Sequence, residues 1–168
     1  MAFKHFFPNE IADSVYHIDY DIFWQKGIRG LIFDIDNTLA TFDTPHPDAA
    51  VIELLTTLTK KGFKIAFLSN NKKERVKIFN KEFGFPHIWK AGKPRLSGMR
   101  RALESLGLSK RRVILIGDQI FTDCWVGRRA GVYTILTKPI ALKDEWQVKL
   151  KRYPEKLVLW AYRRKRRD

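Results

Sequence analysis

Cysteine is nearly absent from this chain of 168 residues, and histidine is scarce. The single cysteine, Cys124, cannot form an intramolecular disulfide, so a reducing compartment, the cytoplasm, is expected. Cys124 stands beside Trp125 in an apolar stretch, which favours a buried thiol over a nucleophile. The four histidines show no metal-ligand spacing and receive no catalytic role: His5, His17, His46 and His87.

Long apolar runs are also missing. No stretch approaches the roughly 20 residues that a membrane-spanning helix requires. The N-terminal segment lacks the uninterrupted apolar region of a signal peptide. We therefore expect a cytoplasmic protein that does not span the membrane.

Acidic residues are few relative to basic ones. The chain has 18 Asp and Glu against 32 Lys and Arg, a formal net charge of +14. A positive field of this size raises the local concentration of anionic partners, such as nucleic acid, anionic lipid or a phosphorylated substrate. A merely well-solvated basic surface is the alternative, and charge alone does not choose among these.

The composition is that of a soluble globular protein, with 45% hydrophobic and 30% charged residues. We expect one domain over residues 1–168, with a core at about 28–140 and a basic helical tail at 141–168. Residues 1–28 are rich in Phe, Tyr and Trp, which predicts a short helical or irregular layer packed on the core. A membrane or partner contact is the alternative for this segment.

Apolar runs of strand length alternate with helical patterns. The predicted strands are Leu31–Phe33, Ile65–Leu68, Val113–Ile116 and Val132–Leu136, with a weaker one at His87–Trp89. The predicted helices are Asp48–Lys61, Lys72–Phe83, Arg95–Leu106 and Asp123–Ala130. Each is followed by a glycine that can end it: Gly62, Gly84, Gly107 and Gly131. Pro94 is expected in the first turn of the third helix and Thr122 at the N-cap of the fourth. This alternation predicts an α/β domain, a doubly wound (Rossmann-like) three-layer α/β/α fold with a parallel sheet.

Polar residues follow three of these strands. Asp34, Ser69 and Asp118 each stand where a predicted strand ends. Ligands of doubly wound sheets bind beyond the carboxyl ends of the strands, so we expect these side chains to meet in one crevice.

The pair Asp34 and Asp36 places two carboxylates at the end of a buried strand, which is unfavourable unless a cation or a proton compensates them. A divalent ion would keep Asp34 ionised and aimed at phosphorus, while Asp36 exchanges a proton. Asp118 and Asp123 supply further oxygen, and hard ligands without histidine or thiol partners favour Mg²⁺ over zinc. The alternative is that Asp118 is only a turn residue and Asp123 a first-turn helix charge.

Three further residues suit phosphate binding. Ser69 and Asn70 offer a hydroxyl and backbone N–H groups to phosphate oxygens, a role that is compatible with capping the next helix. Lys93 can supply the cation that offsets phosphate charge in the transition state. Taken alone, a lysine before a proline is more typical of a solvated loop.

The ordered set resembles the four motifs of the haloacid dehalogenase superfamily of phosphohydrolases, over residues 30 to 137. The matching segments are Asp34-Ile35-Asp36-Asn37-Thr38, Ser69-Asn70, Lys93-Pro94, and Gly117-Asp118 with Asp123. The resemblance implies that Asp34 attacks phosphorus and forms an aspartyl-phosphate. It implies that Asp36 protonates the leaving oxygen and then takes a proton from the hydrolytic water.

The same resemblance implies a metal site and a phosphate site. Mg²⁺ would lie between the Asp34 carboxylate, the Asp36 backbone carbonyl and Asp118, with Asp123 bound directly or through water. Thr38 would orient the loop, and the phosphoryl group would be held by Ser69, Asn70 and Lys93.

More narrowly, the chain is similar to the capless YqeG group (class IIIA), which includes the mitochondrial phosphatidylglycerophosphate phosphatases. The similarity rests on Asp34–Leu39, Lys26–Gly30, Ser69–Asn71 and the basic ending after Thr137–Pro139. Only 32 residues separate Asp36 from Ser69 and 23 separate Ser69 from Lys93, which leaves no room for a substantial cap domain. An open site favours a large or surface-bound substrate, and the resemblance implies the lipid headgroup of phosphatidylglycerophosphate. The alternatives are a nucleic-acid end, a soluble phosphorylated metabolite, or a non-catalytic RNA- or ribosome-binding role.

The tail is the most basic segment, with eleven Lys or Arg against four Asp or Glu in residues 138–168. An apolar stretch, Leu157–Tyr162, precedes the cations Arg163–Arg167, a pattern that suits a peripheral anchor on an anionic membrane at the inner membrane surface. A helix docked on the sheet and an RNA-contacting tail are the alternatives. Pro154 is expected to break the helix.

Overall fold

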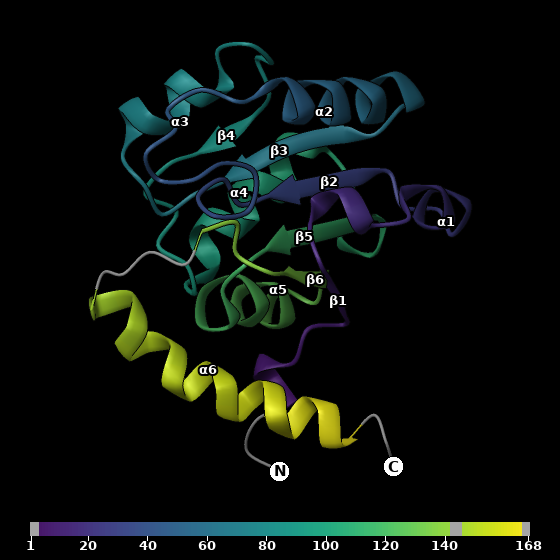
Figure 1. Cartoon of the computed structure of the whole chain (residues 1–168). Helices are drawn as coiled ribbons and strands as arrows, with labels where there is room; N and C mark the ends of the chain where they lie inside the picture. The colour runs from purple at the N-terminus through teal and green to yellow at the C-terminus, as the bar shows by residue number, and fades with distance from the viewer. Residues whose placement is uncertain (1–3, 142–145, 166–168) are drawn as a thin grey trace.

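A parallel six-stranded sheet forms the centre of the protein, and this computed structural model describes residues 4–141 and 146–165 (Figure 1). All strand pairings are parallel, in the order β1-β6-β5-β2-β3-β4. The strands are β1 (Glu10–Ala12), β2 (Gly30–Phe33), β3 (Lys64–Leu68), β4 (His87–Ile88), β5 (Val113–Gly117) and β6 (Tyr133–Thr137). The predicted doubly wound α/β fold is confirmed.

Helices cover both faces of the sheet. They are α1 (Tyr20–Gln25), α2 (Ala49–Lys61), α3 (Lys73–Asn80), α4 (Leu96–Leu106), α5 (Trp125–Ala130) and α6 (Trp146–Lys165). Alternate residues of β2 enter opposite layers, because Leu31 and Phe33 pack with α1, α2 and α3 while Ile32 packs with α4 and α5. The strands are buried on both faces, which explains their continuous apolar runs.

Several predicted boundaries differ from the structure. Helix α3 ends at Asn80 rather than at Phe83, because the Asn80 side chain bonds both the N–H and the C=O of Phe85 and turns the chain. Gly84 therefore closes the following turn, at φ 66°, instead of ending the helix directly. The strand expected at His87–Trp89 is shorter by one residue.

The N-terminal segment packs on the core, as expected. Its Tyr20 and Phe23 are buried, and Phe6 packs edge-on against Phe121. The segment also contributes the edge strand β1, which was not predicted because three residues are too short for a periodic pattern.

Helix α6 is continuous from Trp146 to Lys165, so the expected break at Pro154 is wrong (Figure 1). A proline inside a helix removes one backbone donor and destabilises it by about 3 kcal/mol. Tertiary contacts offset that loss: Val158 and Tyr162 are buried, and the Glu155 carboxylate accepts a bond from the Ile120 N–H at 3.1 Å. The helix is thus docked through one face, onto a cluster that includes the fully buried Cys124.

Candidate active site

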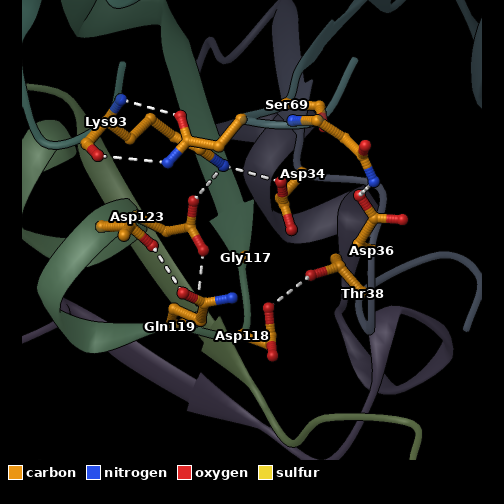
Figure 2. Close-up of polar contacts among 12 residues, drawn as sticks. Asp34, Asp36, Thr38, Ser69, Lys93, Gly117, Asp118, Gln119 and Asp123 are labelled. Atoms are coloured by element: carbon orange, nitrogen blue, oxygen red, sulfur yellow. Dashed lines mark hydrogen bonds and ion pairs between the residues drawn. The ribbon is translucent and has the colours of Figure 1, made fainter. Parts of the chain in front are cut away.

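Three neighbouring strands of the sheet end at the same edge. Phe33 of β2 is in register with Phe67 of β3 and with Ile116 of β5. Asp34, Ser69 and Asp118 follow these strands within one or two residues, so their side chains meet beyond the carboxyl ends (Figure 2). The predicted convergence of these segments is confirmed.

An acidic cluster lies at this edge. One carboxylate oxygen from each of Asp34, Asp118 and Asp123 lies within 4.8 Å of the others, and all three residues are buried. Thr38, from the loop after β2, donates to Oδ1 of Asp118 at 3.4 Å. The loop after β2 and the segment after β5 are therefore joined by side chains at the site.

Lys93 enters the cluster from the loop before α4. Its Nζ donates to Oδ1 of Asp34 and to Oδ1 of Asp123, each at 2.6 Å, and its side chain is only 3% exposed. The side-chain amide of Asn70 fixes this loop, because it accepts from the Lys93 N–H at 2.8 Å and donates to the Lys93 C=O at 3.1 Å. Asn70 thus positions Lys93, a role that sequence reasoning did not assign.

Pro94 does not lie in the first turn of α4, as was expected. The helix begins at Leu96, and the Lys93–Pro94 peptide bond is cis. The loop from Gly92 to Arg95 is a tight turn closed by a bond from the Arg95 N–H to the Gly92 C=O at 2.8 Å, so Pro94 shapes the loop that carries Lys93.

Asp123 reaches the site from a π-helical turn, Ile120–Cys124, that precedes α5. The predicted N-cap at Thr122 is wrong, because Thr122 lies inside this turn and α5 begins at Trp125. Such turns occur often at functional sites. Gly117 makes the approach possible, since a Cβ there would lie 2.4 Å from Cγ of Asp123.

Burial and like charge control the electrostatics of the cluster. Burial raises the pKa of Asp34 to about 7, with Lys93 lowering that pKa and Asp123 raising it. Burial, reinforced by the Asp34 and Asp123 charges, also raises the pKa of Asp118 well above its ordinary value. Burial lowers the pKa of Lys93, but the charges of Asp123 and Asp34 more than offset this and leave that pKa raised.

The donor set fits a divalent cation. The Lys93 ammonium bonds two of the three buried carboxylates, Asp34 and Asp123, so the cluster carries excess negative charge away from water when all three are ionised. A bound cation would compensate that charge and favour the ionised carboxylates. The acidic cluster offers oxygen ligands, which hard cations such as Mg²⁺ and Ca²⁺ prefer.

Asp36 lies beside the cluster and is held by α3 and the residues before it. Its Oδ2 accepts from Nδ2 of Asn71 at 2.9 Å, and its Oδ1 accepts from Nε of Arg75 at 3.2 Å. The reversal after Asp36 uses Asn37 in the left-handed region, at φ 63°, where Asn is tolerated. Sequence reasoning gave Asn71 and Arg75 no role: Asn71 was only part of a short motif, and Arg75 resembles any exposed helix cation.

Ser69 completes the set of predicted residues. It is 1% exposed, and its Oγ accepts from the Asn71 N–H at 3.0 Å. The hydroxyl hydrogen can still be donated to an anionic ligand. The predicted site residues therefore lie at this one edge of the sheet, and Asn70 contributes by fixing the backbone of Lys93.

The fold and the site define an α/β protein with a buried acidic cluster at the carboxyl edge of a parallel sheet, and comparison with known proteins gives its family. The haloacid dehalogenase-like hydrolase family matches residues 40–131. The probable phosphatase YqeG of Bacillus subtilis is 36% identical over 98% of this chain and 96% of its own length. This chain therefore belongs to the haloacid dehalogenase-like hydrolases, and the prediction of an enzyme of this family is confirmed.

Two further proteins are similar to this chain at lower sequence identity. The chloroplastic/mitochondrial phosphatidylglycerophosphate phosphatase 1 of Arabidopsis thaliana is 26% identical over 82% of this chain, which spans only 42% of that protein's length. A crystal structure of a putative β-phosphoglucomutase from Thermotoga maritima is 16% identical, with a TM-score of 0.56 over 74% of this chain and 91% of that one. The second likeness concerns the fold alone.

Proposed function

We propose that this protein is a Mg²⁺-dependent phosphomonoester hydrolase that works through an aspartyl-phosphate on Asp34. The observation that carries the proposal is the buried cluster of Asp34, Asp118 and Asp123, in which the Lys93 ammonium bonds Asp34 and Asp123. Burying several carboxylates together destabilises a fold, so a role in nucleic-acid binding alone does not account for this cluster. A phosphatase needs it, because the cluster holds both a nucleophile and a countercharge for phosphate.

In the first step, a carboxylate oxygen of Asp34 attacks phosphorus. The P–O bond to the leaving group breaks as the new bond forms, and Asp36 gives its proton to the departing oxygen. Asp36 suits this role because it lies two residues from Asp34 and its carboxylate is held by Asn71 and Arg75.

In the second step, water attacks the phosphorus of the aspartyl-phosphate. Asp36, now ionised, takes the water proton, and inorganic phosphate leaves with Asp34 regenerated. Lys93 balances the charge of the phosphoryl group, while Ser69 and nearby backbone N–H groups bind its oxygens.

Mg²⁺ would be held by Asp34, the Asp36 backbone carbonyl, Asp118 and Asp123. Its positive charge would reduce the repulsion between the Asp34 carboxylate and the anionic phosphate. Thr38 supports this set by donating to Asp118. Asp123 is already held by Lys93 and by the Gln119 N–H at 3.1 Å, which orients its oxygens toward the cluster.

We further propose phosphatidylglycerophosphate as the substrate. The relatives named phosphatidylglycerophosphate phosphatase support this choice, as does the absence of a cap between the motifs. Helices α2 and α3 and the strands beside them take up those intervals, so the described residues place no separate domain over the site. An uncovered site suits a headgroup that is presented at a bilayer.

A phosphate-release panel tests the substrate. The protein should hydrolyse phosphatidylglycerophosphate in vesicles at least about tenfold more efficiently than sugar phosphates or a 3′-phosphorylated oligonucleotide, in a reaction that EDTA stops. If the protein prefers a sugar phosphate, the substrate is a soluble metabolite rather than the lipid. If it prefers the oligonucleotide, the substrate is a nucleic-acid end. Absence of turnover with salt-sensitive RNA binding would favour the non-catalytic alternative.

The outer face of α6 supports a contact with an anionic bilayer. Leu157 is 64% exposed and Trp160 is 62% exposed, and Arg164 lies over the Trp160 ring at 5.6 Å. Apolar and cationic side chains on one face of a helix suit the headgroup boundary. Within the described residues no helix is long and apolar enough to cross a membrane. The cations Lys165–Arg167 of the expected anchor lie outside the described side chains.

Point variants test this contact better than truncation, because removing α6 would uncover the cluster beneath Val158 and Tyr162. We expect Leu157→Ser with Trp160→Ser to weaken the affinity for anionic vesicles, measured by sedimentation, by about a hundredfold, since each side chain loses about 1.5 kcal/mol of apolar burial. Hydrolysis of a soluble aryl phosphate should stay within about twofold. Ile22→Ser with Ile78→Ser, at exposed apolar positions of α1 and α3, is the control. Equal loss of sedimentation in both double variants would contradict the contact.

A further inference from the structure

Arg75 of α3 contacts the side chain that the proposed mechanism uses for proton transfer. We infer that Arg75 is a positioning residue, which holds the Asp36 carboxylate and the segment between β2 and α2 in the arrangement that leaving-group protonation needs. The inference rests on the proposed function and deepens it. It adds to the site a residue outside the four sequence motifs.

The guanidinium of Arg75 bonds three acceptors along the segment between β2 and α2. Its Nε and Nη2 both lie 3.2 Å from Oδ1 of Asp36. Its Nη1 donates to the Pro45 C=O at 2.8 Å, and its Nη2 donates to the Thr41 C=O at 3.2 Å. The side chain is 11% exposed and lies over the Phe79 ring at 5.5 Å. This is a fixed arrangement, unlike the mobile ion pairs of an exposed helix surface.

Both oxygens of Asp36 accept hydrogen bonds from side chains of other residues. Arg75 binds Oδ1, and the Asn71 amide binds Oδ2 at 2.9 Å, so the carboxylate has little freedom to rotate. Asn71 is itself fixed, because its N–H donates to Ser69 Oγ and its Oδ1 accepts from the Lys72 N–H. A general acid must lie within hydrogen-bond reach of the leaving oxygen, so loss of this restraint slows proton transfer.

The geometry requires an arginine. Asp36, Thr41 and Pro45 lie in different directions from the guanidinium, and its planar fork reaches all three. A lysine keeps the positive charge but has one nitrogen, so it cannot replace these bonds. The bonds to the carbonyls of Thr41 and Pro45 also tie the segment between β2 and α2 to α3.

The variant Arg75→Lys keeps the positive charge at position 75 but loses the geometry of the guanidinium. The dependence of the rate on the leaving group of the substrate then reports whether proton transfer by Asp36 is affected. An aryl phosphate with a strongly acidic leaving group needs no proton, whereas an alkyl phosphate does. We expect Arg75→Lys to lower kcat/KM by less than about threefold for p-nitrophenyl phosphate and by about thirtyfold or more for glycerol phosphate, because general acid catalysis contributes roughly 10²–10⁴-fold. A purely structural role would lower both values equally.

Arg29→Lys is the matched control. Arg29 also donates to two backbone carbonyls, those of Trp24 and Ile28 at 2.7 Å, and stacks on the Trp24 ring, but it lies at the opposite end of β2. It should change both substrates by the same small factor. If Arg75→Lys does not fold, Asn71→Ala removes the other Asp36 donor and should give the same selective loss.

Two results would overturn the inference: an equal loss on both substrates in Arg75→Lys and Asn71→Ala, or no loss on either. Failure of the proposed function looks different. In that case Asp34→Asn would keep its activity, whatever Arg75→Lys does. An inactive Asp34→Asn with an unselective Arg75→Lys would reject only the positioning role.

Discussion

We expect Asp34→Asn to lower kcat for phosphate release by about 10⁴-fold or more, the scale seen when a nucleophile that acts in concert with other groups is removed. The side-chain amide of asparagine cannot act as the nucleophile, so the aspartyl-phosphate intermediate does not form. The fold should survive, because Lys93 keeps its bond to Asp123 at 2.6 Å. The measurement is phosphate release at saturating Mg²⁺, together with acid-quench detection of a hydroxylamine-sensitive phosphoryl group on the peptide that contains Asp34.

Asp13→Asn provides the comparison for Asp34→Asn. Asp13 also pairs with a lysine, Lys138, at 2.5 Å, but both side chains are more than 60% exposed, at 64% and 66%. Exposed pairs of this kind contribute little to stability, so Asp13→Asn should keep the full rate. Substantial turnover by Asp34→Asn, or a phosphoryl group on another peptide, would move the nucleophile elsewhere.

We expect Asp118→Asn to stabilise the metal-free protein at pH 8 and to remove its response to Mg²⁺. The pKa values of Asp118 and Asp34 are raised in the folded state, chiefly by burial and then by the neighbouring charges. A carboxyl with a raised folded pKa stabilises the fold at low pH, and that stability is lost as the pH rises through the folded pKa, which for Asp34 is about 7. An asparagine at position 118 does not titrate and removes one of the repelling charges.

Thermal unfolding measures this second effect. In the absence of metal, Asp118→Asn should raise Tm by about 3 °C at pH 8, and by less at pH 5, since functional-site carboxylates often reduce stability. Mg²⁺ should raise the Tm of the unmodified protein at pH 8 and leave Asp118→Asn unchanged. A lower Tm at pH 8 for the variant would mean that Asp118 stabilises the metal-free fold, contrary to the electrostatics proposed for the cluster.

The strand ends and the order of motifs were predictable because they depend on local sequence. Continuous apolar runs locate β2, β3 and β5, and the carboxyl ends of parallel strands share one edge of the sheet. Asp34 and Asp118 could therefore be placed together from residues that lie 84 positions apart, 34 to 118. Glycines at positive φ likewise located the ends of α2, α4 and α5.

The misses share a different cause. Strand β1 has only three residues, too few to show the alternating hydrophobic pattern of a strand. Helix α6 continues through Pro154 because Val158, Tyr162 and Glu155 make contacts with distant segments. Arg75 and Asn71 were overlooked for the same reason. Their roles come from bonds to Asp36, which lies 39 and 35 positions away.

The sequence by itself determined the fold class, the edge of the sheet that carries the site, and the acidic residues that compose it, because the hydrophobic pattern and the position of a polar residue after each strand are local properties of the chain. Only the tertiary structure decided which partner each side chain has: Lys93 between Asp34 and Asp123, Asn70 on the Lys93 backbone, and Arg75 on Asp36. Those pairings depend on how the layers pack and how far each side chain is removed from water. Packing and burial are set by the whole molecule, so no single segment encodes them.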